Sequence, residues 1–356
     1  MRQKHVWGLL LVTLALLVVI GCNKQGDSGG NEVQAASVTV IDFEGRTVSI
    51  NARPERIISL APISTRVIAQ FGLLNNVIGV DQKSYTMDLL PEALSERGLP
   101  ITDLGNARSI NEEAILRLQP DIVITQYDKA QADLLSQRIG VPVVCIQNRG
   151  DIAMDYELFE ILGKVLFASA QADAMVTYMQ TMVDRAKTFA EEHQGIAQPL
   201  VYVATDTSLL NTFPNDFVIR LCGGRNVAAE ISTMNYWGGA TVDTEFLVRA
   251  KPDIIVLWIA FTSPQKIAEF RETISKREFA DIPAIINSRI YTSLSGDGKD
   301  FFYTMTAISE ALHMFYPDAY TAQMLEQDTR AHLQIFFPDV TYEAYREIRD
   351  MVQFVE

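Results

Sequence analysis

The stretch Ser109-Ile-Asn-Glu-Glu-Ala-Ile-Leu-Arg-Leu-Gln-Pro-Asp-Ile-Val-Ile124 recurs without a gap as Thr241-Val-Asp-Thr-Glu-Phe-Leu-Val-Arg-Ala-Lys-Pro-Asp-Ile-Ile-Val256. Measured from Pro120 and Pro252, both copies place a hydroxyl eleven residues upstream, an amide or acid nine upstream, a glutamate seven upstream and an aspartate directly after. A solenoid repeats a short unit many times, whereas these two copies lie more than a hundred residues apart. The repeat therefore predicts two related lobes.

Each copy predicts a helix that is followed by a buried strand. Asn111 and Asp243 are residue types that favour the N-cap of a helix, and about two turns of helical pattern follow each of them. The Pro-Asp step then ends the helix before an apolar run that is typical of a buried strand. Each copy is thus expected to form an α-turn-β unit.

Strand and helix patterns also alternate on both sides of these units. Residues 38–50 alternate apolar and polar side chains around Glu44-Gly45, which predicts a β-hairpin. Further strands are predicted over 56–60, 77–80, 200–204 and 254–259, and helices over 65–71, 216–221 and most of 320–356. This alternation predicts an α/β fold with two α/β lobes, each built on a Rossmann-like, largely parallel sheet.

Residues 151–195 predict a helical connector between the lobes. A break is expected at Ala168-Ser169, where Ser169 can cap the second helix. One apolar stripe follows at three- and four-residue spacing: Met175, Tyr178, Met179, Met182, Val183, Ala186 and Phe189. An ordinary core-facing helix would carry the same stripe, but a helix over 169–192 would span roughly 36 Å. We therefore expect a single long α-helix to join the lobes as a rigid connector.

The N-terminus has the pattern of an export signal. Arg2 and Lys4 precede an apolar stretch, Leu9 to Ile20, that is shorter than the roughly 20 residues a transmembrane helix needs. It ends in Val19-Ile20-Gly21-Cys22, which resembles the lipobox of bacterial lipoproteins, so we expect lipidation of Cys22 to anchor the chain to the cell membrane, in the periplasm or at the cell surface. The expected segments are a lipoprotein signal peptide with lipobox (1–22), a flexible tether (23–37), an N-terminal α/β lobe (38–150), the helical connector (151–195) and a C-terminal α/β lobe with a helical tail (196–356).

Charge and histidine content narrow the choice of partners. The formal net charge is −14, and loss of Arg2 and Lys4 with the signal would lower it to −16, which repels phosphate backbones, so no nucleic acid partner is expected. Outside the signal the histidines are far apart, at His193, His313 and His332. This supply disfavours a multi-histidine cage for bare zinc or manganese, and neither a metal site nor a cofactor is expected.

Enzyme motifs are weak in this sequence. Ser64 has no Gly-x-Ser-x-Gly setting, and no glycine-rich phosphate loop is present. Cys145 in an apolar run and Cys222 before Gly223-Gly224 could pair in an oxidising compartment, although we favour two separate buried thiols. The chain is therefore not expected to catalyse a reaction. It is also expected to bind its ligand as a monomer.

Three further stretches accompany the repeat: Pro54-Glu-Arg-Ile-Ile-Ser-Leu-Ala-Pro62, Gly72-Leu with Val77-Ile-Gly-Val80, and Leu221-Cys-Gly-Gly-Arg-Asn226. With both Pro-Asp units, their order and spacing resemble the periplasmic-binding family for iron-siderophores, haem and cobalamin, from Val38 to the C-terminus. The resemblance implies two lobes joined by one long helix, with the ligand cleft between them and only small lobe movements. It also implies the extracytoplasmic solute-binding component of an ABC importer, which captures a metal chelate such as a ferric siderophore, haem or cobalamin and delivers it to a permease and its ATPase.

Candidates for ligand contact are the side chains that follow predicted strands, where open α/β sheets form their ligand crevice. The aromatic rings among them suit a bulky planar ligand, and tyrosine phenolates could ligate haem iron. Ordinary packing stays an alternative for each. They are Pro62, Ser64, Thr65, Tyr85, Asn106, Gln126, Tyr127, Asp206, Tyr236, Trp237, Trp258, Phe261, Phe302 and Tyr303.

Glu113 and Glu245 occupy the same place in the two repeated units. The resemblance implies that a glutamate seven residues before the Pro-Asp step docks onto arginines of the permease. The alternative is a first-turn carboxylate that only complements the helix dipole, worth about 0.3 to 1 kcal/mol. A lipid-anchored binding domain used as a surface sensor or adhesin, or a secreted hydrolase, are the other functions left open.

Overall fold

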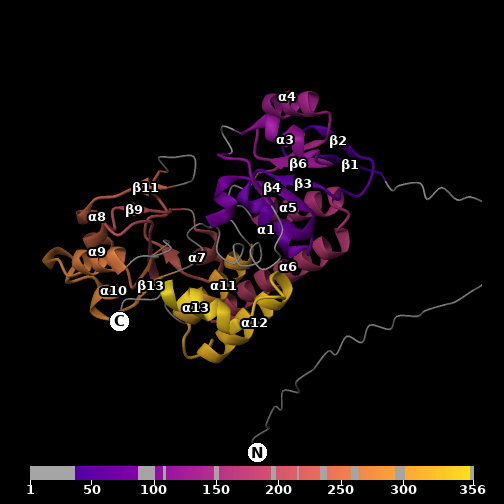
Figure 1. The fold of residues 1–356 in the computed structure, drawn as a ribbon. Helices are drawn as coiled ribbons and strands as arrows, with labels where there is room; N and C mark the ends of the chain where they lie inside the picture. Colours follow the sequence, from indigo (N-terminus) through magenta and orange to yellow (C-terminus); the bar gives the residue numbers. More distant parts are fainter. Residues whose placement is uncertain are drawn as a thin grey trace, which may run out of the picture. The chain divides into compact units, whose positions relative to one another are not determined.

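The computed structural model describes residues 37–86, 101–106, 110–147, 152–193, 198–214, 216–232, 239–257, 264–292 and 301–352. Contacts divide the chain into a first unit, Met1–Ala35, and a compact second unit, Ala36–Glu356, to which all the elements below belong. Figure 1 shows this second unit as two sheets with helices around them. In the described residues, no helix is both long and apolar enough to cross a membrane.

The first sheet has five parallel strands. They are β3 (Ile57–Ser59), β4 (Val77–Val80), β5 (Thr102–Asp103), β6 (Ile122–Thr125) and β7 (Val143–Cys145), in the spatial order β5-β4-β3-β6-β7. All four side chains of β6 are buried, as expected for a strand covered by helices on both faces. After β3, the chain therefore adds β4 and β5 on one side of it, and then β6 and β7 on the other side.

A hairpin precedes this sheet, as the alternation predicts. Strands β1 (Val38–Ile41) and β2 (Thr47–Ile50) pair antiparallel with Val38 opposite Ile50. Gly45 has a φ of 69°, which favours glycine at that turn. The Arg46 guanidinium ties the hairpin to the sheet, because it donates to the carbonyl oxygen of Val143 at 2.7 Å and to Asp133 at 2.7 Å.

The second sheet is mixed. Strands β8 (Leu200–Ala204), β10 (Arg225–Asn226), β12 (Ile254–Leu257) and β13 (Ile290–Thr292) are parallel, whereas β9 (Asn211–Thr212) and β11 (Ala240–Thr241) are antiparallel additions at one edge. The spatial order is β11-β9-β8-β12-β13, with β10 also paired to β8. The predicted class, two α/β lobes with largely parallel sheets, is confirmed, while the short antiparallel strands were not predicted.

The two repeated stretches fold alike. Helix α3 (Glu112–Leu118) begins after Asn111, whose side chain accepts from the N–H of Ala114 at 3.0 Å. Helix α8 (Thr244–Ala250) begins after Asp243, whose side chain accepts from the N–H of Phe246 at 2.7 Å. Both helices end in a left-handed residue before the proline, Gln119 (φ 47°) and Lys251 (φ 45°). The predicted α-turn-β units and their N-caps are therefore confirmed.

The described residues form further helices around the sheets and against one another. They are α1 (Pro62–Gln70), η1 (Leu74–Asn76), η2 (Gln82–Thr86), α4 (Lys129–Ile139), α5 (Ile152–Val165), α6 (Ser169–Glu192), α7 (Phe217–Leu221), α9 (Pro264–Ile274), η3 (Arg277–Phe279), α10 (Pro283–Ile286), α11 (Phe301–Phe315), α12 (Ala322–Phe336) and α13 (Tyr342–Val352). Helix α1 begins earlier than predicted, because Pro62 takes the first helical position, where its missing N–H costs nothing. The prediction of Ser169 as a cap was wrong: Ala168 is the N-cap residue of α6, without a side-chain bond, and Ser169 is already helical.

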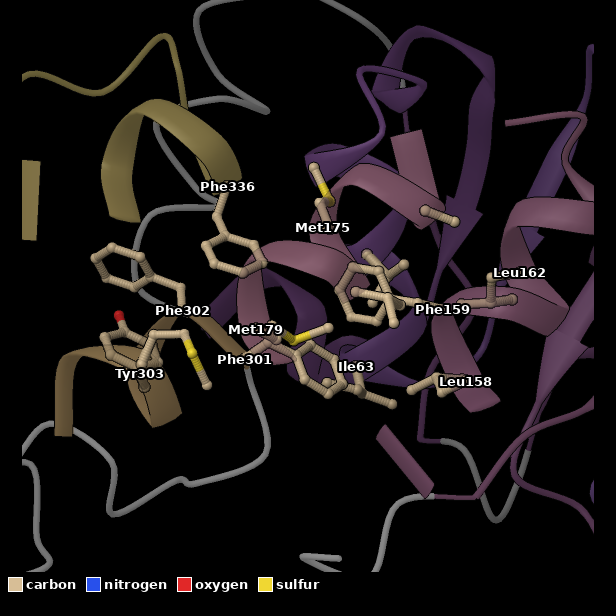
Figure 2. Packing of buried hydrophobic residues seen from close by; sticks show 14 of the residues in the cluster. Ile63, Leu158, Phe159, Leu162, Met175, Met179, Phe301, Phe302, Tyr303 and Phe336 are labelled. Carbon is tan, nitrogen blue, oxygen red and sulfur yellow. The ribbon is translucent and has the colours of Figure 1, made fainter. Parts of the chain in front are cut away.

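The stripe of α6 faces the core. Met175, Met179, Met182 and Ala186 are buried, and α6 packs against α5 and α11. Figure 2 shows Met179 in this cluster with Phe159 of α5 and Phe301 of α11, whose ring centroids lie 4.4 Å apart in an edge-to-face contact. The same cluster includes side chains from both sheets, such as Ile122 and Val256. The lobes therefore share one continuous apolar core along α6.

A buried polar network fastens α6 to the C-terminal helices. Tyr178 of α6 and Ser309 of α11 flank His332 of α12, at 2.7 Å from Nδ1 and 3.1 Å from Nε2. One turn before His332 on α12, the Asp328 carboxylate accepts from the Arg185 guanidinium at 2.8 Å. Burial lowers the pKa of His332 to about 4, so its imidazole is neutral near pH 7.

The two cysteines of the second unit are separate, as favoured from the sequence. Cys145 and Cys222 are buried free thiols. Burial raises the pKa of both, to about 12 for Cys145, so neither is a thiolate near neutral pH.

Candidate functional site

The carboxyl ends of β3 and β6 lie side by side at one edge of the first sheet. These strands are neighbours, yet the chain leaves them toward opposite sides of the sheet, which is the topological switch point where open α/β folds bind ligands. Strand β3 leads into Pro62 at the start of α1, and β6 leads into Gln126 and Tyr127. Gln126 is exposed and Tyr127 half-buried, and burial raises the pKa of the Tyr127 phenol. The structure thus brings three of the candidates to one edge.

A chain of hydrogen bonds between buried hydroxyl groups lies next to this edge. Ser64 and Thr65 are fully buried. The Ser59 Oγ lies 2.6 Å from the Ser64 Oγ and accepts from the Thr65 Oγ1 at 2.7 Å. The chain of bonds continues from Thr65 to Ser84 at 3.0 Å and from Ser84 to the carboxylate of Asp81 at 2.7 Å. These bonds join the start of α1 to η2, so they favour a positioning role for Ser64 and Thr65, whose ligand contact stays a prediction.

The neighbouring strand ends carry two more candidates. Asn106 is exposed just after β5, where the carbonyl oxygen of Gly105 accepts from the N–H of Gln82 at 2.9 Å. Tyr85 belongs to η2, although its side chain lies outside the described residues. The backbone bond between Gly105 and Gln82 holds the ends of β4 and β5 together at the edge where Gln126 and Tyr127 emerge.

The second lobe has an equivalent switch point between β8 and β12. Asp206 follows β8, and its carboxylate accepts from the N–H of Ser208 at 3.1 Å, from the Ser208 hydroxyl at 2.7 Å and from the Asn211 amide. Asp206 therefore closes the turn between β8 and β9. The candidates Tyr236, Trp237, Trp258 and Phe261 lie outside the described residues.

Phe302 and Tyr303 lie in the first turn of α11 and not in a loop after a strand. Phe302 is fully buried, and its ring makes edge-to-face contacts with Phe337 and Tyr345 at 5.5 Å. Tyr303 is also buried, with the Arg66 guanidinium 5.1 Å from its ring centroid. This burial favours packing for both side chains, and a ligand contact stays a prediction.

Glu113 and Glu245 are equivalent in space as well as in sequence. Each is the second residue of its helix, and the side chains are 79 % and 83 % exposed. Each pairs with the arginine one turn on, Glu113 with Arg117 at 3.1 Å and Glu245 with Arg249 at 3.3 Å. Exposed pairs of this spacing contribute only about 0.3 to 0.5 kcal/mol, so both carboxylates can exchange partners at little cost.

Residues 57–295 match the profile of the periplasmic binding protein family, which is more than half of the chain. The chain belongs to this family. An uncharacterised ABC transporter substrate-binding lipoprotein of Bacillus subtilis is 24% identical over 306 residues, covering 82% of this chain and 89% of the relative. The vitamin B12-binding protein of Vibrio campbellii is 24% identical over 279 residues, covering 74% and 90%.

Solved structures agree on the fold of this periplasmic binding protein. A periplasmic solute-binding protein from Veillonella parvula superposes with a TM-score of 0.72 at 21% identity, covering 88% of this chain and 97% of that one. The resemblance to the periplasmic-binding family that was expected from the sequence is thus confirmed.

The aspartates after Pro120 and Pro252 have a role that the sequence reasoning missed. Asp121 accepts from the N–H groups of Glu55 and Arg56, at 2.8 and 2.9 Å, just before β3. Asp253 accepts from the N–H of Leu200 at the start of β8, at 2.9 Å. Each aspartate therefore aligns the two strands that flank the switch point. The exact recurrence of Pro-Asp was the signal that could have revealed this.

Proposed function

We propose that this periplasmic binding protein captures a metal chelate, such as a ferric siderophore, haem or cobalamin, between its two switch-point edges and delivers it to an ABC permease and ATPase. The observation that carries the proposal is twofold: the same α-turn-β unit contributes to one switch-point edge in each lobe. Relatives are named cobalamin-binding protein, vitamin B12-binding protein and probable siderophore-binding lipoprotein, which supports a chelate as the ligand. The protein acts in this role as a binder, with no catalytic step.

A ligand panel tests the proposal. The purified protein is titrated with haem, cobalamin, several ferric siderophores, molybdate and Zn²⁺, and binding is followed by absorbance and thermal shift. We expect one chelate to bind, and Tyr127→Ala to weaken that binding about tenfold because an aromatic face at the edge is lost. Gln137→Ala, an exposed change on α4, is the control and should bind as the wild type does. Binding of Zn²⁺ or molybdate with no response to any chelate would exclude the proposed ligand class.

We further propose that the protein is held outside the cytoplasm by a lipid on Cys22. The lipobox pattern and the lipoprotein names of two relatives support this anchor. A Cys22→Ser variant should leave the membrane fraction, since the cysteine thiol is the site of lipidation. Intact mass of the wild type measures the expected cleavage before Cys22. Retention of Cys22→Ser in the membrane at the precursor mass would contradict the anchor.

A sensor or adhesin would use the same ligand-binding body without transport. The two roles separate in reconstituted membranes that contain the permease and ATPase, because only an importer component supports ATP-dependent uptake of the bound chelate. Uptake by the wild type supports the importer role, whereas binding without uptake supports a sensor.

A further inference from the structure

Helices α3 and α8 carry Glu113 and Glu245, the carboxylates expected to dock onto the permease, and are called the docking helices here. They differ at their C-terminal ends. In the first lobe Arg56, just before β3, donates to the carbonyl oxygens of Leu118 and Gln119, at 2.5 and 3.0 Å, and so covers the end of α3. In the second lobe Leu200 takes the place of Arg56. The N–H of Asp253 donates to the carbonyl oxygen of Leu200 at 2.7 Å, just as the N–H of Asp121 donates to the carbonyl oxygen of Arg56 at 2.8 Å. Leucine has no group that can cap the end of α8.

A groove of about 200 Å³ lies where this arginine is missing. Its walls are the start of β8, the strand β10 and the last turn of α8, with Leu200, Arg225, Val227, Phe246, Arg249 and Ala250 as lining residues. At about 30 Å³ per water molecule, such a space accepts one partner side chain or several waters. In the described part of the chain, no side chain donates a hydrogen bond to the carbonyl oxygen of Ala250.

Charge decides which side chain fits the groove. Arg225 is exposed, and its guanidinium makes no hydrogen bond or ion pair with any residue that the structure describes. Arg249 lines the same groove and is 69 % exposed. Arg225 and Arg249 both line the groove, so it favours a carboxylate and repels a basic side chain, and guanidinium binds carboxylate in a fork-like geometry.

The groove shares a residue with the ion pair of Glu245, the carboxylate expected to dock onto the permease. Arg249 both lines the groove and pairs with Glu245 at 3.3 Å. A partner group that takes Glu245 would therefore release Arg249 toward the groove. In the described residues of the first lobe, Arg56 instead covers the end of α3, and Arg138 is paired with Glu112 at 2.9 Å.

From these observations we infer that the groove between α8, β8 and β10 is a second docking contact, which receives an acidic side chain of the permease between Arg225 and Arg249. The inference rests on the proposed importer function and adds a contact that only the second lobe makes. Docking then uses opposite charges side by side, with Glu245 facing a basic group and Arg225 facing an acidic one. Such an arrangement fixes the register of the second lobe on its partner.

Binding of the full-length protein to its permease in nanodiscs tests the inference. Arg225→Glu should weaken binding about tenfold by opposing like charges, and Leu200→Arg should do the same by filling the groove as Arg56 does in the first lobe. Lys187→Glu on the exposed side of α6 makes the same change in net charge and should bind as the wild type does. Ligand affinity should stay unchanged in all three, because none lies at a switch-point edge.

The outcomes separate the groove from the importer function. Weaker binding of both groove variants with an unaffected control supports the contact. Wild-type binding by Arg225→Glu and Leu200→Arg, while Glu245→Arg fails to bind, overturns the groove and leaves the importer function standing. No effect of any variant, Glu245→Arg included, overturns the groove and the docking role of Glu245. Failure of the wild type itself to bind the permease overturns the importer function. Binding of the wild type to anionic vesicles without permease, lost in Arg225→Glu, would assign the groove to a lipid headgroup and overturn the inference.

Discussion

Charge reversal at both docking helices, Glu113→Arg with Glu245→Arg, is expected to abolish chelate uptake while leaving ligand affinity unchanged. Both carboxylates are exposed on the second residue of equivalent helices, so they can face permease arginines in the same way. Reversal places like charges across two contacts, which costs several kcal/mol in docking. Folding should lose only about 1 kcal/mol for each change, because the pairs with Arg117 and Arg249 and the helix dipoles contribute little.

Uptake in reconstituted membranes and ligand affinity in solution are measured side by side for each single variant and for the double variant. Each single change should reduce uptake, and the double change should reduce it further. Glu191→Arg with Glu192→Arg at the exposed end of α6 makes the same change in net charge and should transport normally. Undiminished transport by the double docking variant would leave both glutamates as carboxylates that only complement their helix dipoles.

Local pattern was enough to predict several strands and the N-caps of both repeated helices. Strands β4 and β8 have the predicted bounds, and both N-caps, Asn111 and Asp243, are in place. These features depend on residues near in sequence: a capping side chain bonds a backbone N–H three residues on, and a buried parallel strand is a continuous apolar run. The sequence therefore carries them without knowledge of the tertiary structure.

Features that depend on distant partners could not be predicted. Phe302 is a ligand candidate because it is aromatic, but its place in the first turn of α11 and its packing on Phe337 and Tyr345, far along the chain, were not predicted. The bonds that bury Ser64 and Thr65 depend on Ser84 and Asp81, which only the pairing of β3 with β4 brings near. Polar residue types alone do not distinguish a supporting network from ligand contact.

The cap of α6 shows how packing overrides local preference. Ser169 has the better side chain for an N-cap, but Ala168 takes that position and makes no side-chain bond. The chain turns tightly between α5 and α6, where the N–H of Ala168 donates to the carbonyl oxygen of Gly163 at 2.7 Å. Close approach of the two helices there sets the start of α6, so the sequence prediction was one residue late.

Gly163→Val is expected to destabilise the protein by about 3 kcal/mol, because α5 and α6 leave no space for a side chain at that position. A Cβ atom on Gly163 would lie 2.5 Å from the Cβ of Ala172 and 3.4 Å from the Cα of Ser169. The Ala172 Cβ is fixed to the backbone of α6 and cannot rotate away, so the helices must separate. Valine has a helix propensity better than that of glycine by a few tenths of a kcal/mol, which does not offset this overlap.

Chemical denaturation of Gly163→Val and of Lys164→Val measures the effect. Lys164 is the next residue of α5 and is exposed, so its change to valine should alter the free energy of unfolding by less than about 0.5 kcal/mol. A swap of the pair, Gly163→Ala with Ala172→Gly, should recover part of the stability that Gly163→Ala loses alone, since the methyl group moves from one helix to the other. Because α6 carries one core through both lobes, loss of this contact should also broaden the unfolding transition. Wild-type stability of Gly163→Val would show that α5 and α6 can move apart freely, and would remove the basis for a rigid connector.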